Sequence, residues 1–218
     1  MGQMARSRAF DTGDVVRAAR DVFWSRGYDA AAMPDLERAT GLARSSLYNA
    51  FGSKRGLFDA AVQSYLDEVV RPRLAALVAA PTGAAGLRAY FESVAEAVLG
   101  GADGAGRDGN PPGCLLLVAA AGSGGRDREV RAAVDAYRLE VTRAFADALR
   151  RDSSGGGGTG GLQRDGGVEE EREAWMARQA RLLFAVLAAG LTLARINGDE
   201  AVATLRSAVH LADAAAVR

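Results

Sequence analysis

The stretch RSSLYNAFGSK, between positions 44 and 54, carries six polar or basic side chains that could contact DNA, besides Ser53. An arginine can donate two hydrogen bonds to the edge of guanine, an asparagine can bond the edge of adenine in the same way, and hydroxyl groups reach bases or phosphate oxygens. The stretch therefore predicts contacts to DNA, provided that a helix presents these side chains on one exposed face. They are Arg44, Ser45, Ser46, Tyr48, Asn49 and Lys54.

Lys54 is the only lysine among 27 basic residues, and it directly follows Gly52 and Ser53. Ser53 is expected to cap a helix that begins at this point, where free backbone N–H groups and the positive end of the helix dipole favour an anion. A compact, mobile ammonium suits a phosphate as a point charge. We expect Lys54 to contact the DNA backbone; the alternative is that it is an ordinary exposed cation.

Glycines divide the first part of the chain into three helices, predicted over residues 12–26, 33–40 and 43–51. The first is expected to begin with Thr12 as its cap, and Gly27, Gly41 and Gly52 follow the three C-terminal ends. Two short helices joined by a glycine turn are typical of a helix-turn-helix, in which the second helix lies in the DNA major groove. The pattern thus predicts that residues 43–51 read DNA.

These motifs, taken together over residues 18–61, resemble the TetR (tetracycline repressor) family of bacterial transcriptional regulators. The resemblance lies in RGY at 26–28, ATGL at 39–42, LYNAFGSK at 47–54, and LF at 57–58, in family order. It implies a homodimer with one DNA-binding head per subunit, a ligand pocket in the second domain, and a palindromic operator that is released when a small molecule binds.

The resemblance also implies roles for single residues. Tyr48 and Lys54 match the family's phosphate contacts, and Arg44, Ser45, Ser46 and Asn49 occupy its base-reading or groove-facing positions. Two features depart from the family pattern. Ala31 and Ala32 stand where Thr or Ser commonly caps the second helix, and Asn49 stands where His is frequent, so the operator preference does not carry over.

Longer apolar-polar periods follow, without strand patterns, and they predict an all-α protein of about nine helices. A fourth helix is expected from Ser53 toward Leu77 with a bend at Pro72. Further helices are expected over 82–99, 113–122, 126–151, 168–196 and 198–217. We expect a helix-turn-helix domain at 1–54 and an effector-binding and dimerisation domain at 55–218, with residues 152–167 as a flexible glycine-rich loop.

The second domain offers two further candidate sites. Aromatic residues and one cysteine on its helices are candidates for an apolar effector pocket, although most of them are expected to belong to the core: Phe91, Cys114, Tyr137, Phe145, Trp175 and Phe184. The run at 182–194 is apolar nearly all round and therefore needs cover from a partner as well as from its own core. The expected dimer interface consists of Leu183, Leu187, Gly190, Leu191, Leu205 and Val209.

Other functional classes find little support in the sequence. The chain has one cysteine, Cys114, one histidine, His210, and a formal net charge of zero, so we expect no metal, no cofactor, no enzymatic activity and a cytoplasmic location. The 13-residue run at 182–194 is shorter than a membrane span. Two alternatives stay open: a regulator that senses oxidants or electrophiles through Cys114, and a helical ligand-binding protein without DNA activity.

Overall fold

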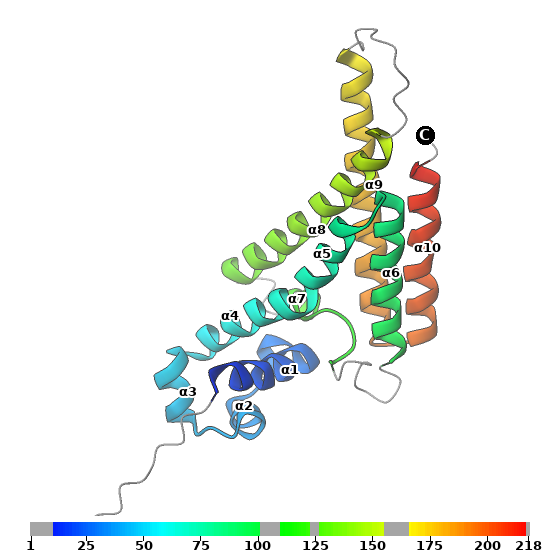
Figure 1. The fold of residues 1–218 in the computed structure, drawn as a ribbon. Helices are drawn as coiled ribbons and strands as arrows, with labels where there is room; N and C mark the ends of the chain where they lie inside the picture. The colour runs from blue at the N-terminus through cyan, green and yellow to red at the C-terminus, as the bar shows by residue number, and fades with distance from the viewer. Residues whose placement is uncertain (1–10, 101–109, 123–126, 155–165, 217–218) are drawn as a thin grey trace, which may run out of the picture.

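The computed structural model describes residues 11–100, 110–122, 127–154 and 166–216, and within these residues the chain is helical throughout its regular elements (Figure 1). The all-α prediction is therefore confirmed. The helices are α1 (Thr12–Ala30), α2 (Met33–Thr40), α3 (Arg44–Phe51), α4 (Lys54–Tyr65), the π-helical segment η1 (Leu66–Val70), α5 (Arg71–Ala79), α6 (Gly83–Leu99), α7 (Leu115–Ala121), α8 (Arg128–Ser154), α9 (Gly166–Leu193) and α10 (Gly198–Ala216).

The ends of α1 show one confirmed and one wrong prediction. The cap is Asp11 and not Thr12, because the Asp11 carboxylate accepts a hydrogen bond from the Gly13 N–H at 2.8 Å. Gly27 breaks the helix at the predicted position, with a φ of 81° in the left-handed region that favours glycine, but α1 resumes after it and runs to Ala30. The chain thus turns at Gly27, and the last residues of α1 lead directly into α2.

The helix-turn-helix consists of α2 and α3. Gly41 ends α2 with a left-handed φ of 69°, as predicted, and Gly52 follows α3 with a φ of 75°. Neither Ala32 nor Ala43 supplies a side-chain cap at the start of its helix. Buried Leu36 and Leu47 fix the two helices to the core instead.

A continuous helical segment of α4, η1 and α5 connects the head to the rest of the chain (Figure 1). The π-helical turn lies directly before Pro72, where the sequence predicted a bend. Pro72 has no N–H to donate to the preceding turn, and the Arg71 N–H bonds to the carbonyl of Leu66, five residues back. The helix therefore changes its winding ahead of the proline and continues beyond it.

Beyond α5, helix α10 packs against both α6 and α9, and α8 packs against α9, α6 and α5 (Figure 1). The approach of α9 to α10 is close: a Cβ at Gly190 would lie 2.6 Å from Leu205 Cγ. Buried side chains form one connected hydrophobic cluster that includes Phe23 and Phe58 of the head as well as Phe91 and Phe145. The two halves therefore share a core. The predicted loop at 152–167 lies largely outside the described residues.

Candidate functional site

Helix α3 presents the predicted polar residues on its outer side. Arg44, Ser45 and Asn49 are exposed, while Ser46 and Tyr48 are half-buried. Leu47 points the other way and is 2% exposed, so it anchors the helix against the head. Guanidinium, hydroxyl and carboxamide groups therefore lie together on one short helix that is anchored in the core.

Arg44 and Tyr48 lie one helical turn apart and contact each other. The Arg44 guanidinium donates to the Tyr48 hydroxyl at 3.4 Å, and its carbon lies 5.4 Å from the centroid of the Tyr48 ring. Pairs spaced by four residues face each other on a helix. The contact restricts both side chains before any partner is bound.

Lys54 begins α4, as the sequence predicted, and Ser53 caps that helix by accepting a hydrogen bond from the Gly56 N–H at 3.0 Å. The Lys54 ammonium lies 4.7 Å from the centroid of the Tyr28 ring and donates to the Asp29 carbonyl at 3.5 Å. Partial burial lowers the pKa of Lys54, which the charge of Asp29 opposes. The only lysine is therefore held at the turn between α1 and α2, beside the start of α4.

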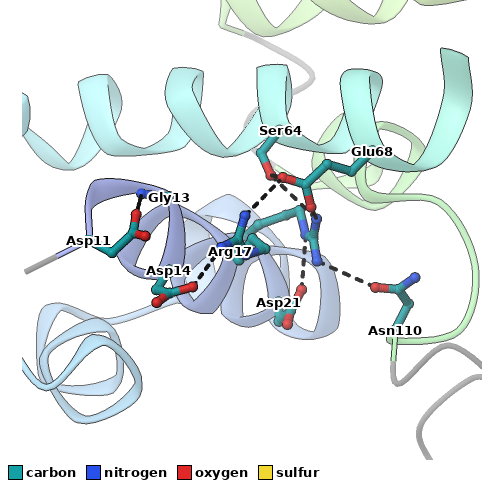
Figure 2. A network of polar contacts seen from close by, with 9 residues as sticks. Asp11, Gly13, Asp14, Arg17, Asp21, Ser64, Glu68 and Asn110 are labelled. Carbon is teal, nitrogen blue, oxygen red and sulfur yellow. Dashed lines mark hydrogen bonds and ion pairs between the residues drawn. The ribbon is translucent and has the colours of Figure 1, made fainter. Parts of the chain in front are cut away.

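Two arginines that the sequence analysis did not single out join the head to the rest of the molecule. Arg20 of α1 is 6% exposed and donates to Glu68 of η1 at 2.8 Å and to Asn110 at 3.4 Å. Figure 2 shows Ser64 and Glu68 above α1, with Arg17 between Asp14 and Glu68 and with Asn110 at the right. A buried arginine needs such partners, but its spacing in the sequence does not distinguish it from other helical arginines.

Arg195, which follows α9, makes the second connection. Its guanidinium donates to the backbone carbonyls of Trp24 at 3.1 Å, Ser25 at 2.7 Å and Pro112 at 3.4 Å. It thus ties the end of α9 to the C-terminal part of α1 and to the segment before α7. No local pattern predicts a contact between positions 170 residues apart.

A cavity lies where these segments meet. It is partly open to solvent, and the accessible space inside it measures about 60 Å³. Valines of η1 and α6, leucines of α9 and the two prolines at 111 and 112 make most of its wall apolar. Its polar members come from α1, α4, α5, α6, α8 and the segment before α7: Trp24, Tyr65, Arg73, Tyr90, Tyr137 and Asn110.

The structure places only one of the six predicted pocket residues on this wall, Tyr137. Phe91 and Phe145 are fully buried, with ring centroids 5.5 Å apart, and they form the core behind the cavity. Phe184 packs against Tyr137 with a centroid distance of 5.9 Å, and Trp175 is half-buried outside the wall. The correction has a simple cause: a large aromatic residue signals burial, but not which surface it faces.

Cys114 also lies behind the wall and is 1% exposed. Burial raises the pKa of its thiol, although hydrogen bonds with the Tyr65 and Tyr137 phenols oppose that rise. A thiol with a raised pKa carries little thiolate at neutral pH, and the thiolate is the reactive form. The surroundings therefore favour a structural thiol over a sensor.

Alkylation of Cys114 tests this conclusion. In native protein at neutral pH we expect iodoacetamide to label the thiol at least about tenfold more slowly than in urea-unfolded protein, because burial removes both access and thiolate. Intact-mass spectrometry measures the rate, and the unfolded chain serves as its control. Equal rates in both states would restore the sensor interpretation.

The expected dimer residues need a similar correction. Leu183, Leu187, Leu205 and Val209 are at most 6% exposed within their own chain, and Gly190 packs against Leu205. Leu191, which is half-buried, lies on the cavity wall. The outward positions of α9 are Leu182, Ala185 and Ala189, with Leu182 51% exposed. The inner stripe that the sequence assigned to a partner is thus packed within its own chain.

Comparison with known proteins bears on the same elements. A family model described as bacterial regulatory proteins, tetR family, matches residues 15–61. A solved structure of the TetR family transcriptional regulator CifR, a cysteine mutant complexed with 26-base-pair double-strand operator DNA, is 30% identical over 94% of this chain and 98% of that chain, with a TM-score of 0.68. The chain belongs to the TetR family.

Two curated relatives match shorter stretches of the chain. The HTH-type transcriptional repressor ComR of Escherichia coli K12 is 30% identical over 113 residues, 51% of this chain and 50% of ComR. The uncharacterized HTH-type transcriptional regulator YezE of Bacillus subtilis 168 is 45% identical over 64 residues, 29% of this chain and 33% of YezE. The matched stretches thus span a third to a half of the length of these relatives, whereas the match to CifR spans nearly the whole length of both chains.

Proposed function

We propose that the protein is a homodimeric transcriptional repressor that binds a palindromic operator through α3 and releases it when a small, largely apolar effector enters the cavity. The observation that carries the proposal is the outer side of α3, where Arg44, Ser45 and Asn49 stand exposed on a helix seated by Leu47. The relative CifR is described in complex with double-strand operator DNA. The proposed DNA-binding head comprises residues 1–54, and residues 55–218 form the effector domain.

Division of labour among the head residues follows from their chemistry. Arg44, Ser45, Ser46 and Asn49 contact base edges in the major groove, where each base pair offers a distinct set of donors and acceptors. Tyr48 and Lys54 contact phosphates and fix the register of α3 on the duplex. Lys54 is already held beside Tyr28 and Asp29, so it loses less freedom on binding than a fully extended lysine.

The homodimer uses the outward sides of α9 and α10. Leu182 and Leu211 are 51% and 39% exposed there, and alanines lie between the large residues. By length and composition Gly167–Leu193 would also suffice to cross a membrane, with a third of its apolar window buried in the chain. In the proposed dimer a second copy of the chain, and not a lipid bilayer, covers this face. The dimer also brings two α3 helices to the two half-sites of a palindromic operator.

The effector site is the cavity between the head and the second domain. Trp24 of α1 forms part of its wall, so a ligand there touches the helix against which α2 and α4 pack. Ligand binding shifts a population only if the ligand prefers one conformer, and typical coupling of about 1–3 kcal/mol changes affinity about 5- to 150-fold. A ligand that binds more tightly to a conformer with α1 displaced raises the population of that conformer. Operator affinity then falls, because α2 and α4 pack against α1.

Lys54→Ala and Arg44→Ala are expected to weaken DNA binding in different ways. Lys54→Ala removes a phosphate contact, so affinity falls across all sequences and the slope of log affinity against log salt drops by about one. Arg44→Ala costs about 1–3 kcal/mol and relaxes preference at one base pair. Fluorescence anisotropy with DNA from the region beside the protein's own coding sequence, titrated at several salt concentrations, measures both effects.

Arg138→Ala is the control for these two variants, because Arg138 is a half-buried arginine of α8 that pairs with Asp135 at 2.8 Å, away from α3. Its operator affinity and salt slope are expected to equal those of the wild type. If Tyr48→Ala and Lys54→Ala also leave DNA binding unchanged, the protein is a helical ligand-binding protein without DNA activity, and the proposal fails.

A further inference from the structure

Arg55, the second residue of α4, joins the first turn of that helix to the start of α8. Its guanidinium pairs with Asp127 at 2.8 Å and with Glu129 at 3.1 Å, and also with Asp59 of its own helix at 2.8 Å. The Arg55 side chain is 20% exposed, and its guanidinium carbon lies 5.9 Å from the centroid of the Phe58 ring. A partly buried arginine with several partners fixes its surroundings better than an isolated surface pair does.

Asp127 is also the cap of α8. Its carboxylate accepts hydrogen bonds from the Glu129 and Val130 N–H groups at 2.8 and 3.1 Å while it pairs with Arg55. The hydrogen bond from Arg55 holds the pKa of the Asp127 carboxyl below its usual range. Arg55 is therefore tied to the first turn of a long helix and not to a freely moving surface side chain.

The first turn of α4 is in backbone contact with the end of α3. A Cβ at Gly56 would lie 2.1 Å from the Phe51 carbonyl oxygen, so no side chain fits between the two helices at this point. The Ser53 N–H donates to the same carbonyl at 2.8 Å. Residues 51–56 thus form one closely packed unit, and a contact that fixes Arg55 also fixes the direction of α3.

We propose that Arg55 is a positioning residue for DNA binding, which acts through Asp127 and Glu129 to hold the start of α4, and α3 with it, in the orientation that fits the operator. It contacts no phosphate itself, because each of its three guanidinium nitrogens already faces a carboxylate. The inference rests on the proposed function of α3. It adds a contact that sets the fraction of molecules competent to bind, and apparent affinity is reduced by that fraction.

Asp127→Asn combined with Glu129→Gln removes both charges of α8 and keeps a side chain that caps the helix. We expect this variant to bind operator DNA about tenfold more weakly than the wild type, because fewer molecules hold α3 in the competent orientation. The slope of log affinity against log salt is expected to stay unchanged. If Arg55 instead contacted a phosphate, removal of two anions would free it and raise the affinity. An affinity equal to or above that of the wild type therefore overturns the proposal.

Arg55→Met removes the other side of the same contact. Its affinity is expected to fall by the same factor with an unchanged salt slope, and the triple variant is expected to fall no further, since all three substitutions break one contact. Arg55→Lys keeps the charge and is expected to retain most of the affinity. A salt slope that drops by about one in Arg55→Met contradicts the positioning role, and so does a triple variant about a hundredfold weaker than the wild type.

Asp59→Asn is the matched control, because it breaks the pair within α4 and leaves both contacts to α8 in place. Its affinity is expected to stay within about twofold of the wild type, as for a helical surface pair. Anisotropy compares all variants on the DNA used for Lys54→Ala, and circular dichroism checks that each melts cooperatively. If Lys54→Ala weakens binding but the Arg55 variants do not, the positioning role fails and the proposed function stands. A wild type that binds no such DNA overturns the proposed function, and the positioning role with it.

Discussion

Replacing Leu182 and Ala189 by glutamate together is expected to convert the protein to a monomer and to lower its operator affinity about 100-fold or more. Both side chains lie on the outward side of α9, so two carboxylates there disturb no core contact within the chain, whereas they place like charges opposite each other across a two-fold axis. A dimer that engages two half-sites gains about 10²- to 10⁴-fold from effective concentration. Loss of the dimer removes this gain.

Analytical ultracentrifugation gives the oligomeric state of the double variant, and anisotropy with full operator and half-operator duplexes gives its affinity. The matched control places the same two charges on α5 and α8, as Val78→Glu with Ala132→Glu, where Val78 is 61% exposed. The control is expected to stay dimeric and to bind like the wild type. A double variant on α9 that stays dimeric would place the subunit interface on another face.

The helices of the head were predictable because local chemistry decides them. A glycine with positive φ follows α2 and α3 and interrupts α1, and only glycine adopts that conformation at low cost. The cap of α1 was misplaced by one residue because Asp11 and Thr12 are both good capping residues. Which of two adjacent residues caps the helix depends on the backbone conformation just before it, and the residue types alone do not determine that conformation.

The cavity was less predictable because its wall is assembled by long-range packing. Phe91 and Phe145 have the size and polarity of pocket residues, yet they fill the core, whereas Trp24 reaches the cavity from the DNA-binding head. The same holds for the proposed dimer face: the sequence shows that α9 is apolar, but its inner and outer sides are distinguished only by the position of α10. Periodicity identifies an apolar helix and does not orient it.

The contacts of Arg20 and Arg195 explain how cavity and head are joined. Arg20 belongs to α1 and donates to Glu68 of η1 and to Asn110. Arg195 donates to the carbonyl of Trp24 in α1 and to that of Pro112. Both arginines therefore contact the segment Asn110–Pro112 at the cavity wall. A ligand that displaces this segment changes contacts of two cations, whose hydrogen bonds are stronger than those between neutral groups. The coupling that the proposed function requires is thus supported by charged contacts that bridge the two halves.

Gly83→Ala is expected to lower the free energy of unfolding by about 3 kcal/mol, because overpacking costs typically 1–3 kcal/mol and a helix cap is lost as well. A Cβ at Gly83 would lie 1.8 Å from the Ala148 carbonyl oxygen, which is backbone and cannot move aside without shifting α8. The Gly83 and Ala84 N–H groups also donate to the Asp152 carboxylate at 2.6 and 2.5 Å. Separation of the two helices therefore breaks an anionic cap as well.

Gly198→Ala is the matched control, since Gly198 also begins a helix, α10, but a Cβ added to it would have no atom within 4 Å. Its effect is expected to stay within about 0.5 kcal/mol, as for most surface substitutions. Urea unfolding followed by far-UV circular dichroism at one protein concentration compares the two, since the stability of a dimer depends on concentration. Equal midpoints would mean that α6 and α8 are not in backbone contact at Gly83, and the shared core of the second domain would then need a different packing.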